Sequence, residues 1–261
     1  MSRGARLGQH FLHDPEFIER SVAAIAPRPG DALVEIGPGR GALTSLLLAR
    51  AGSLDVVEID RELAGRLGPR PGLRVHVGDA LAWPFESFAT GGNRVRIAGN
   101  LPYYLSTPLL FRLFERADAI EDMHFMLQRE VVARMTAEPG TSAYGRLGLM
   151  VRCHAEATAL FEVPPEAFRP PPRVWSAFVR LRPHRPGPVR DVDGFRRLVT
   201  RAFTHRRKRL GNALRGTLDE ATIRACGVDP DRRPGTLTLE EFSRLASAAS
   251  IAEGAGDGPS A

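Results

Sequence analysis

Short apolar runs alternate with segments of helical spacing along the first half of the chain. Five segments are expected to be strands, the first of them buried: Ala32–Ile36, Leu54–Ile59, Leu73–Val77, Val95–Ala98 and Met123–Leu127. Three segments between or after them are expected to be helices: Ala42–Ala51, Thr107–Ala117 and Glu130–Thr136. Strands that alternate with helices are typical of a parallel α/β sheet. The pattern therefore predicts an α/β domain.

A helix is also expected ahead of the first strand, over Asp14–Ala26. Its apolar residues recur at the spacing of one helical face: Phe17, Ile18, Val22 and Ile25. Asp14 is a candidate N-cap, with Pro15 at the first helical position.

The second half of the chain changes character after Pro183. Leu147–Phe161 and Trp175–Leu181 are expected to be further strands, separated by the proline-rich segment Val163–Arg173. Beyond a short Pro/Gly segment, Asp193–Arg215 and Thr238–Ala249 have helical patterns. Thr238 and Glu241 fit a capping box at the start of the last helix.

These patterns predict four parts of the chain. We expect a catalytic domain over residues 1–183, a linker over 184–188, a small all-helical domain over 189–250 and a disordered tail over 251–261.

Composition limits the possible compartments and partners. Hydrophobic residues make up 43% of the 261 residues, which is typical of a chain with a buried core. No apolar stretch is long enough to span a membrane, and residues 1–8 are basic but precede no apolar segment of a secretory signal. The two cysteines, Cys153 and Cys226, form neither metal spacing nor a disulfide framework, and we expect a cytoplasmic protein.

The net charge of +6 favours a polyanionic partner such as nucleic acid. The charge is concentrated in the segment 201–216, which has six basic residues and no acid. Phe203, Leu210 and Leu214 are expected to form its buried stripe. A basic face is then left for phosphates, and four of its residues are the expected RNA contacts: Arg206, Arg207, Lys208 and Arg209.

A glycine turn follows the first expected strand, in the string V-E-I-G-P-G-R-G that ends at Gly41. Glycine lets the backbone bend tightly and lets a ligand approach the main chain. Glu58 ends the next strand, where an acid can bind both ribose hydroxyls of an adenosyl group, and Asp79 follows the third strand. The turn and Glu58 alone fit either NAD or S-adenosylmethionine, whereas the G-x-G-x-G form and Asp79 favour S-adenosylmethionine.

The tetrapeptide N-L-P-Y, Asn100–Tyr103, is the most informative motif. The amide oxygen of Asn100 and the backbone carbonyl of Leu101 can each accept an N–H of an exocyclic amine. Pro102 restricts Leu101 to extended geometry, which aims that carbonyl, and Tyr103 can stack on a heterocycle. The motif therefore predicts a site that presents adenine N6 for transfer.

Seven motifs in this order resemble those of the ribosomal RNA adenine N6,N6-dimethyltransferases, most closely the KsgA type that acts on the small ribosomal subunit. They are Gln9–Leu12, Glu35–Gly41, Glu58–Asp60, Gly78–Leu81, Asn100–Tyr103, Tyr144–Leu147 and Phe168–Val174. The resemblance implies a Rossmann-like class I methyltransferase with a mixed, mostly parallel sheet and a small all-helical C-terminal domain. It also implies S-adenosylmethionine as methyl donor without a metal, two adjacent adenosines near the 3′ end of 16S rRNA in an immature 30S subunit as substrate, and a role in ribosome biogenesis.

By position, the resemblance assigns six residues to the cofactor site: His10, Leu12, Gly37, Glu58, Asp79 and Asn100. It assigns five to catalysis: Asn100, Leu101, Pro102, Tyr103 and Phe168. Phe168 would close over the face of the target base opposite Tyr103. His10 stands where the family commonly has Asn, a change that a backbone contact would survive.

Three other functions are compatible with parts of the sequence. An erythromycin-resistance methylase shares the fold and chemistry but modifies 23S rRNA. A NAD-dependent oxidoreductase would use the same glycine turn, but it does not explain N-L-P-Y or the basic helix. A catalytically silent assembly factor would retain the fold, against which the intact Asn100–Tyr103 motif argues. We expect a monomer.

Overall fold

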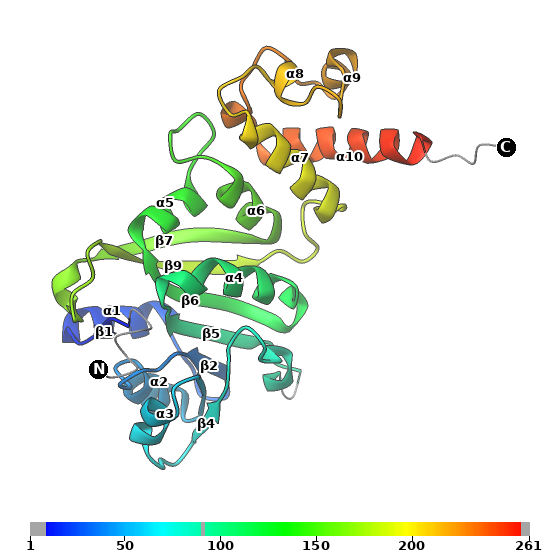
Figure 1. Ribbon diagram of the computed structural model, residues 1–261. Helices are drawn as coiled ribbons and strands as arrows, with labels where there is room; N and C mark the ends of the chain where they lie inside the picture. The colour runs from blue at the N-terminus through cyan, green and yellow to red at the C-terminus, as the bar shows by residue number, and fades with distance from the viewer. Residues whose placement is uncertain (1–8, 90–91, 257–261) are drawn as a thin grey trace. The chain divides into compact units, whose positions relative to one another are not determined.

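The computed structural model describes residues 9–89 and 92–256 (Figure 1). Within them, seven strands form one sheet in the order β4-β3-β2-β5-β6-β9-β7. The strands are β2 (Ala32–Ile36), β3 (Leu54–Glu58), β4 (Leu73–Val77), β5 (Val95–Asn100), β6 (Ile120–Gln128), β7 (Ala155–Val163) and β9 (Ser176–Pro183). Neighbours from β4 through β6 are parallel, whereas β6 and β9 are antiparallel. The expected mixed, mostly parallel sheet is confirmed.

Two very short strands form a separate pair. In it, β1 (Phe11–Leu12) runs antiparallel to β8 (Phe168–Arg169), with Leu12 opposite Phe168. The pair fastens the start of the described chain to the proline-rich segment that precedes β9.

The helices and turns have the following bounds: α1 (Pro15–Ile25), α2 (Thr44–Ala51), α3 (Arg61–Leu67), η2 (Phe85–Phe88), α4 (Tyr103–Phe114), η3 (Ala117–Ala119), α5 (Arg129–Thr136), α6 (Arg146–His154), η4 (Pro165–Ala167), α7 (Val192–Thr204), α8 (Leu210–Ala213), α9 (Glu220–Ala225), η5 (Pro234–Thr236) and α10 (Leu239–Gly256).

Two expected caps are confirmed. Asp14 accepts the N–H of Glu16 at the start of α1, with Pro15 next in the chain. Thr238 and Glu241 exchange backbone-to-side-chain hydrogen bonds of 2.8 and 3.3 Å.

The chain forms two compact units. Unit 1 comprises the described residues up to Val132 together with Glu156–Arg185, and it contains the sheet. Unit 2 comprises Ala133–Ala155 and the described residues from Pro186 onward. This division differs from the expected one because α6 packs with α7 and α10, so a segment expected in the N-terminal domain belongs to the helical unit.

The expected strand over Leu147–Phe161 is wrong in its first half. Residues up to His154 form α6, and only Ala155–Val163 is a strand. A short apolar run does not distinguish a buried strand from a buried helix. The packing of this helix depends on Gly148. A Cβ at this position would lie 2.6 Å from the Arg134 carbonyl, so α6 lies directly against the backbone at Arg134.

The C-terminal helices also depart from expectation at two points. The continuous helix expected over Asp193–Arg215 ends at Thr204, and α8 begins only at Leu210, whose N–H bonds to the Arg232 carbonyl instead of to a helical turn. The last helix continues through Gly256, so residues 251–256 of the expected tail are helical. Positions 257–261, like residues 1–8 of the expected basic start, lie outside the described residues.

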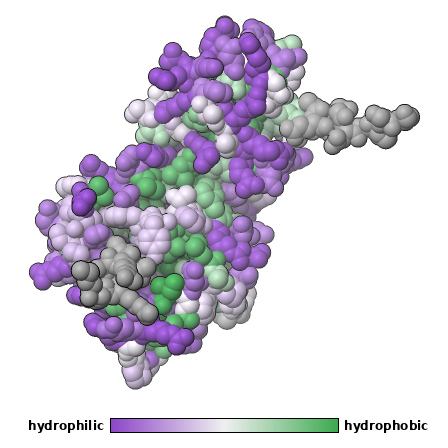
Figure 2. Space-filling model, viewed as in Figure 1, coloured by the Kyte–Doolittle hydropathy of each residue, from purple (hydrophilic) through white to green (hydrophobic). Residues whose placement is uncertain are grey.

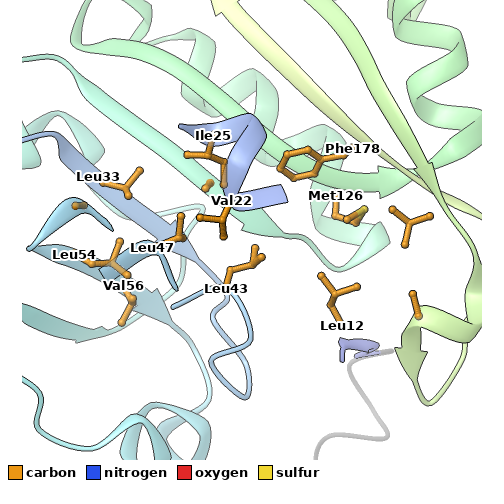
Figure 3. Close-up of a cluster of buried hydrophobic side chains, with 14 of the residues drawn as sticks. Leu12, Val22, Ile25, Leu33, Leu43, Leu47, Leu54, Val56, Met126 and Phe178 are labelled. Atoms are coloured by element: carbon orange, nitrogen blue, oxygen red, sulfur yellow. The ribbon is translucent and has the colours of Figure 1, made fainter. Parts of the chain in front are cut away.

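The core of unit 1 lies between the sheet and the first two helices (Figure 3). Val22 and Ile25 of α1 and Leu47 of α2 are almost fully buried against Leu33 of β2 and Val56 of β3. Full burial of one such side chain stabilises the fold by about 1.5–3 kcal/mol. The cluster therefore fixes the glycine turn that joins β2 to α2.

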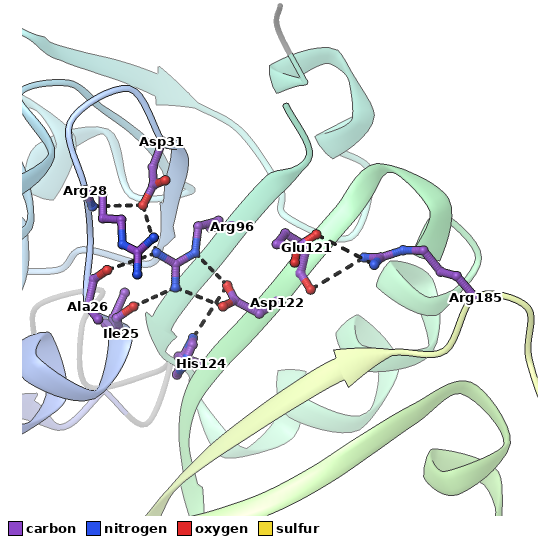
Figure 4. A network of polar contacts seen from close by, with 9 residues as sticks. All are labelled: Ile25, Ala26, Arg28, Asp31, Arg96, Glu121, Asp122, His124 and Arg185. Carbon is purple, nitrogen blue, oxygen red and sulfur yellow. Dashed lines mark hydrogen bonds and ion pairs between the residues drawn. The ribbon is translucent and has the colours of Figure 1, made fainter. Parts of the chain in front are cut away.

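A partly buried arginine connects the central strands near their amino-terminal ends (Figure 4). Arg96 of β5 donates to both carboxylate oxygens of Asp122 on β6, to Asp31 and to the carbonyls of Ile25 and Ala26 at the end of α1. Breaking such a buried pair from one side leaves an uncompensated charge, which costs about 3–5 kcal/mol. This network therefore sets the position of α1 on the sheet.

Candidate active site

A pocket in unit 1 lies where the parallel strands β2 to β5 end. In open α/β sheets, ligands bind at the carboxyl ends of the strands. Every residue that the sequence assigns to cofactor binding or catalysis lines this pocket: His10, Leu12, Gly37, Glu58, Asp79, Asn100, Leu101, Pro102, Tyr103 and Phe168. Residues spread over about 160 positions of sequence are thus brought together.

The glycine turn after β2 forms the floor of the pocket. Gly39 has a φ of +55°, in the left-handed region that favours glycine. Its N–H donates to Glu58 at 3.2 Å, and the ring of Phe11 would lie 3.0 Å from a Cβ at this position. The guanidinium of Arg40 covers the same ring at 4.6 Å. The turn is therefore in close contact with β1, a feature that sequence spacing does not reveal.

Glu58 is buried at the end of β3 with its carboxylate held by backbone groups. The N–H of Asp60 donates to Oε1 at 3.0 Å, and that of Gly39 donates to Oε2. Burial raises the pKa of Glu58, and these two hydrogen bonds oppose the rise. Each carboxylate oxygen retains acceptor capacity for a further donor, such as a hydroxyl.

Asp79 stands at the neighbouring strand end and is more open. Its Oδ1 accepts the N–H of Leu81 at 2.9 Å, in a turn that follows β4. The residue is exposed on the pocket wall, beside the exposed side chain of Ile59. An exposed carboxylate next to an apolar surface can accept from an amine on the edge of a flat ring.

A second buried acid, Glu35, lines the pocket without having been singled out by the sequence. It is 2% exposed, and the hydroxyl of Thr44 donates to its Oε2 at 2.6 Å. Burial raises its pKa from 4.5 to about 7; the bond from Thr44 opposes the rise, and the charge of Glu58 adds to it. The only signal for it in the sequence is an acid inside an apolar strand.

Asn100 ends β5 with its side chain fixed by a distant backbone group. Its Nδ2 donates to the carbonyl of His10 at 2.9 Å, so that Oδ1 is the atom left for a ligand donor. His10 in turn is held by a 2.8 Å hydrogen bond between its Nδ1 and the Pro170 carbonyl, which requires the proton on Nδ1. The polar contact of His10 with the pocket is thus made by its backbone.

The end of β5 approaches the end of β2 closely, and Gly99 permits this. A Cβ on Gly99 would lie 2.5 Å from the carbonyl oxygen of Ile36. Any larger residue would push apart the two strands that carry Asn100 and the glycine turn. This glycine lies outside the motifs by which the sequence predicts the site.

Tyr103 opens α4 immediately after Pro102, four residues before the helix start expected from sequence. Its hydroxyl lies 3.0 Å from the Ser176 hydroxyl on β9, which fixes the ring across the strand ends. Burial raises the pKa of Tyr103, so the phenol stays neutral. The ring is partly exposed and lines the pocket.

Phe168 is more deeply buried than its expected role implies. It is 2% exposed, belongs to the core cluster and pairs with Leu12 through β8. One edge of it still lines the pocket. In this conformation the residue anchors the wall of the pocket and does not extend from it.

The basic run lies in unit 2 and its members differ in their surroundings. Arg206 donates to the carbonyls of Thr141 and Ser142, and Arg209 pairs with Asp231. The side chains of Arg207 and Lys208 are exposed and have no partner among the described residues. On the face in view in Figure 2, hydrophilic side chains cover most of this unit. Of the expected buried stripe, Leu210 and Leu214 are fully buried, and Phe203 packs partly exposed against Tyr144 and Phe242.

No helix in the part of the chain that the structure describes is long and apolar enough to cross a membrane. No three of its His, Cys, Asp and Glu side chains are grouped in a way that could hold a metal ion.

Comparison with known proteins decides the family. The family model of ribosomal RNA adenine dimethylases matches residues 2–250. The chain belongs to the ribosomal RNA adenine dimethylase family. The expected family and the expected enzyme class are thereby confirmed, and the NAD-dependent alternative is excluded.

Curated members of the family cover nearly the whole chain. The protein named ribosomal RNA small subunit methyltransferase A from Laribacter hongkongensis is 51% identical over 92% of this chain and 93% of its own. The protein of the same name from Nitrosococcus oceani is 49% identical over the same shares.

Solved structures agree with the fold. A dimethyladenosine transferase from Plasmodium falciparum superposes with a TM-score of 0.76 at 25% identity, covering 90% of this chain and 96% of that one. The 23S rRNA methyltransferase ErmE superposes with a TM-score of 0.72 at 24% identity over 92% and 99%, a likeness that shows the shared fold alone. The expected Rossmann-like fold of this adenine dimethylase is confirmed.

Proposed function

We propose that this protein uses S-adenosylmethionine to dimethylate N6 of two adjacent adenosines in the loop of the 3′-terminal hairpin of 16S rRNA, in an immature 30S subunit. The names of relatives about half identical over nearly the whole chain support the small subunit as target. The observation that carries the chemistry is the hydrogen bond from Asn100 to His10, because it leaves Oδ1 facing a ligand as an acceptor.

The pocket residues fit S-adenosylmethionine. Gly39 and its left-handed neighbours leave the turn open to close approach, as the methionine portion of the cofactor would need. The backbone-anchored carboxylate of Glu58 suits the two ribose hydroxyls, and the exposed carboxylate of Asp79 suits the adenine amine. When bound, the cofactor supplies an electrophilic methyl group on a good leaving group.

The chain's own residues would orient the nucleophile. The target adenosine has to leave its stack to reach the pocket. Tyr103 and Phe168 would contact its two faces, and base–aromatic stacking contributes about 1–3 kcal/mol per base. Asn100 Oδ1 and the Leu101 carbonyl would accept the two N–H groups of N6, with Pro102 holding that carbonyl in place. Orientation of this kind supplies much of the rate in a transfer that needs no strong base.

The second transfer places a limit on the pocket. After one methylation N6 has a single N–H, so one acceptor has to give way to a methyl group. The remaining acceptor then orients the amine alone. Dimethylation therefore requires space beside either Asn100 or Leu101.

Unit 2 would contact the RNA away from the target base. We assign phosphate contacts to Arg206, Arg207, Lys208 and Arg209 of the basic run, acting from a helical C-terminal domain. We further propose that the protein acts as a monomer in the cytoplasm during ribosome biogenesis.

Methyl transfer to defined substrates tests the proposal. Labelled S-adenosylmethionine is supplied with unmethylated 30S particles, 50S particles or free 16S RNA, and products are mapped by mass spectrometry. Dimethyladenosine near the 16S 3′ end, absent with Asn100→Ala, is the expected result. Modification of 23S RNA alone would indicate a resistance-type methylase. Cofactor binding without transfer would indicate a silent assembly factor.

A further inference from the structure

An exposed tryptophan stands beside the pocket without lining it. Trp175 is 42% exposed and immediately precedes Ser176, whose hydroxyl holds the phenol of Tyr103 at 3.0 Å. Adjacent Cα atoms are about 3.8 Å apart, so the indole begins one residue away from the group that fixes the catalytic ring. Ser176 pairs with Gln128, the last residue of β6, so Trp175 lies at the end of the sheet where the parallel strands terminate in the pocket, next to the exposed side chain of Val174.

The indole is held in place by Arg129, the first residue of α5. The backbone N–H of Arg129 donates to the Trp175 carbonyl at 2.9 Å. Its guanidinium carbon lies 5.6 Å from the centre of the indole, within the range of a cation–π contact. Glu162 orients the same guanidinium at 3.4 Å. One side of the ring is thus covered by a positive charge, while the exposed remainder is open to a ligand.

The charge around Trp175 favours an anionic partner. Arg169 and Arg173 are exposed on the segment that leads to it, and residues 167–183 contain no acid. A rigid aromatic ring among arginines is the combination that stacks bases of single-stranded RNA while the cations meet its phosphates.

We propose that Trp175, backed by Arg129, is a stacking platform for the nucleobase next to the target adenosine. The inference rests on the proposed function, since it assumes a flipped adenosine at Tyr103. The neighbouring base would then be held outside the pocket while the target base is inside it, which fixes the register of an RNA with two adjacent adenosines.

Tryptophan fluorescence tests the platform directly, because the chain has only two tryptophans. In a Trp83→Phe background, Trp175 reports alone. Short single-stranded RNAs are titrated with the target adenosine intact and its neighbour either intact or replaced by an abasic ribose. We expect quenching with the intact neighbour and affinity about 5- to 150-fold weaker for the abasic RNA, the range that stacking of one base supplies.

Variants of the platform complete the test. Trp175→Leu keeps an apolar side chain without an aromatic face and should bind intact and abasic RNA equally, whereas Trp175→Phe should retain most of the difference. Ile251→Ala, at another exposed apolar side chain, in unit 2, should behave as wild type. Equal binding of the two RNAs by wild type, or an undiminished difference in Trp175→Leu, would overturn the platform. Quenching that follows protein concentration without RNA would indicate self-association and would also overturn it.

The two proposals fail separately. If the wild-type protein distinguishes the two RNAs but methylates neither 30S particles nor 16S RNA, the proposed reaction is wrong and the platform stands. If it methylates 16S RNA and Trp175→Leu has the same KM and kcat as wild type, the platform is wrong and the reaction stands.

Discussion

The side-chain amide of Asn100 donates to the backbone carbonyl of His10 at 2.9 Å, across 90 positions of sequence. The bond fixes which side of the amide faces the pocket, because only the NH₂ group can donate. His10, which immediately precedes β1, therefore orients the side chain of Asn100 through its backbone carbonyl.

Asn100→Asp should abolish this orientation while conserving size. A carboxylate cannot donate to the His10 carbonyl and is repelled by it, so the side chain turns away. We expect kcat for methyl transfer to fall about 100-fold, the effect of a misplacement of about 1 Å. Asn93→Asp is the matched control, since Asn93 Nδ2 also donates to a backbone carbonyl, that of Gly30, outside the pocket. Equal activity of the two variants would contradict this role of Asn100.

Gly99→Ala should destabilise the contact between the ends of β5 and β2 next to the pocket. Its Cβ would lie 2.5 Å from the Ile36 carbonyl, and overpacking of this kind costs about 1–3 kcal/mol. Gly65→Ala is the control, because Gly65 lies in α3 with no atom within 4 Å of such a Cβ, and Ala there should stabilise by about 0.5–1 kcal/mol. Denaturant unfolding measures both changes. A Gly99→Ala variant as stable and active as wild type would show that the strands separate at no cost.

Glu35→Gln should change how stability depends on pH. The raised pKa means that the folded state keeps a proton that the unfolded state has lost. The stabilisation that this bound proton gives the folded state is complete below pH 4.5 and is lost as the pH rises through 7. The loss amounts to about 3 kcal/mol of unfolding free energy. Gln keeps an acceptor for Thr44 and does not titrate. Unfolding free energies of the unliganded protein from pH 4.5 to 7.5 should therefore fall for wild type relative to Glu35→Gln, and parallel curves would contradict the raised pKa.

His124→Leu should change the pH dependence of stability in the direction opposite to Glu35→Gln. His124 is 1% exposed, neither ring nitrogen has a hydrogen-bond partner among the described residues, and burial lowers its pKa from 6.5 to about 4. The wild-type fold is therefore fully stable with respect to this group above pH 6.5 and loses about 3 kcal/mol as the pH falls through 4. The leucine variant should lack this loss. Since the windows of Glu35 and His124 overlap with opposite sign, the wild-type curve should be flatter than that of either variant.

Local pattern predicted the elements that form the floor of the pocket. β2 and β4 have the bounds expected from sequence, because each is a short segment with apolar residues that is followed by a glycine. The glycine turn and the acids at the strand ends follow from the same local logic. Parallel strands bring their carboxyl ends to one edge, so Glu58, Asp79 and Asn100 could be placed together without coordinates.

Contacts between distant segments could not be predicted in this way. The pairing of β1 with β8 and the bond from Asn100 to His10 join segments far apart in sequence, and no local spacing encodes them. The apolar run of α6 fits a strand as well as a helix. What distinguishes the two is a tertiary contact, the approach of Gly148 to the Arg134 carbonyl, which local sequence does not show. The sequence pattern shows Trp175 only as part of a strand, and its exposure beside Ser176 is visible only in the structure.

Within the basic run, Arg207 and Lys208 should contribute to phosphate binding alone, whereas Arg206 should also stabilise unit 2. The side chains of Arg207 and Lys208 are exposed without partners among the described residues. The double variant Arg207→Glu with Lys208→Glu should therefore weaken RNA binding about tenfold and lower the slope of log Kd against log salt by up to about 2. Its affinity for S-adenosylmethionine should be unchanged. Arg206 instead bonds to the Thr141 and Ser142 carbonyls, so Arg206→Glu should also lower the stability of unit 2. Arg28→Glu with Arg50→Glu is the control. It makes the same charge change before β2 and at the end of α2, away from the pocket at the carboxyl ends of the strands, and should leave the salt dependence of log Kd unaltered. Equal losses of RNA affinity in the two double variants would mean that net charge, and not this run, attracts the RNA.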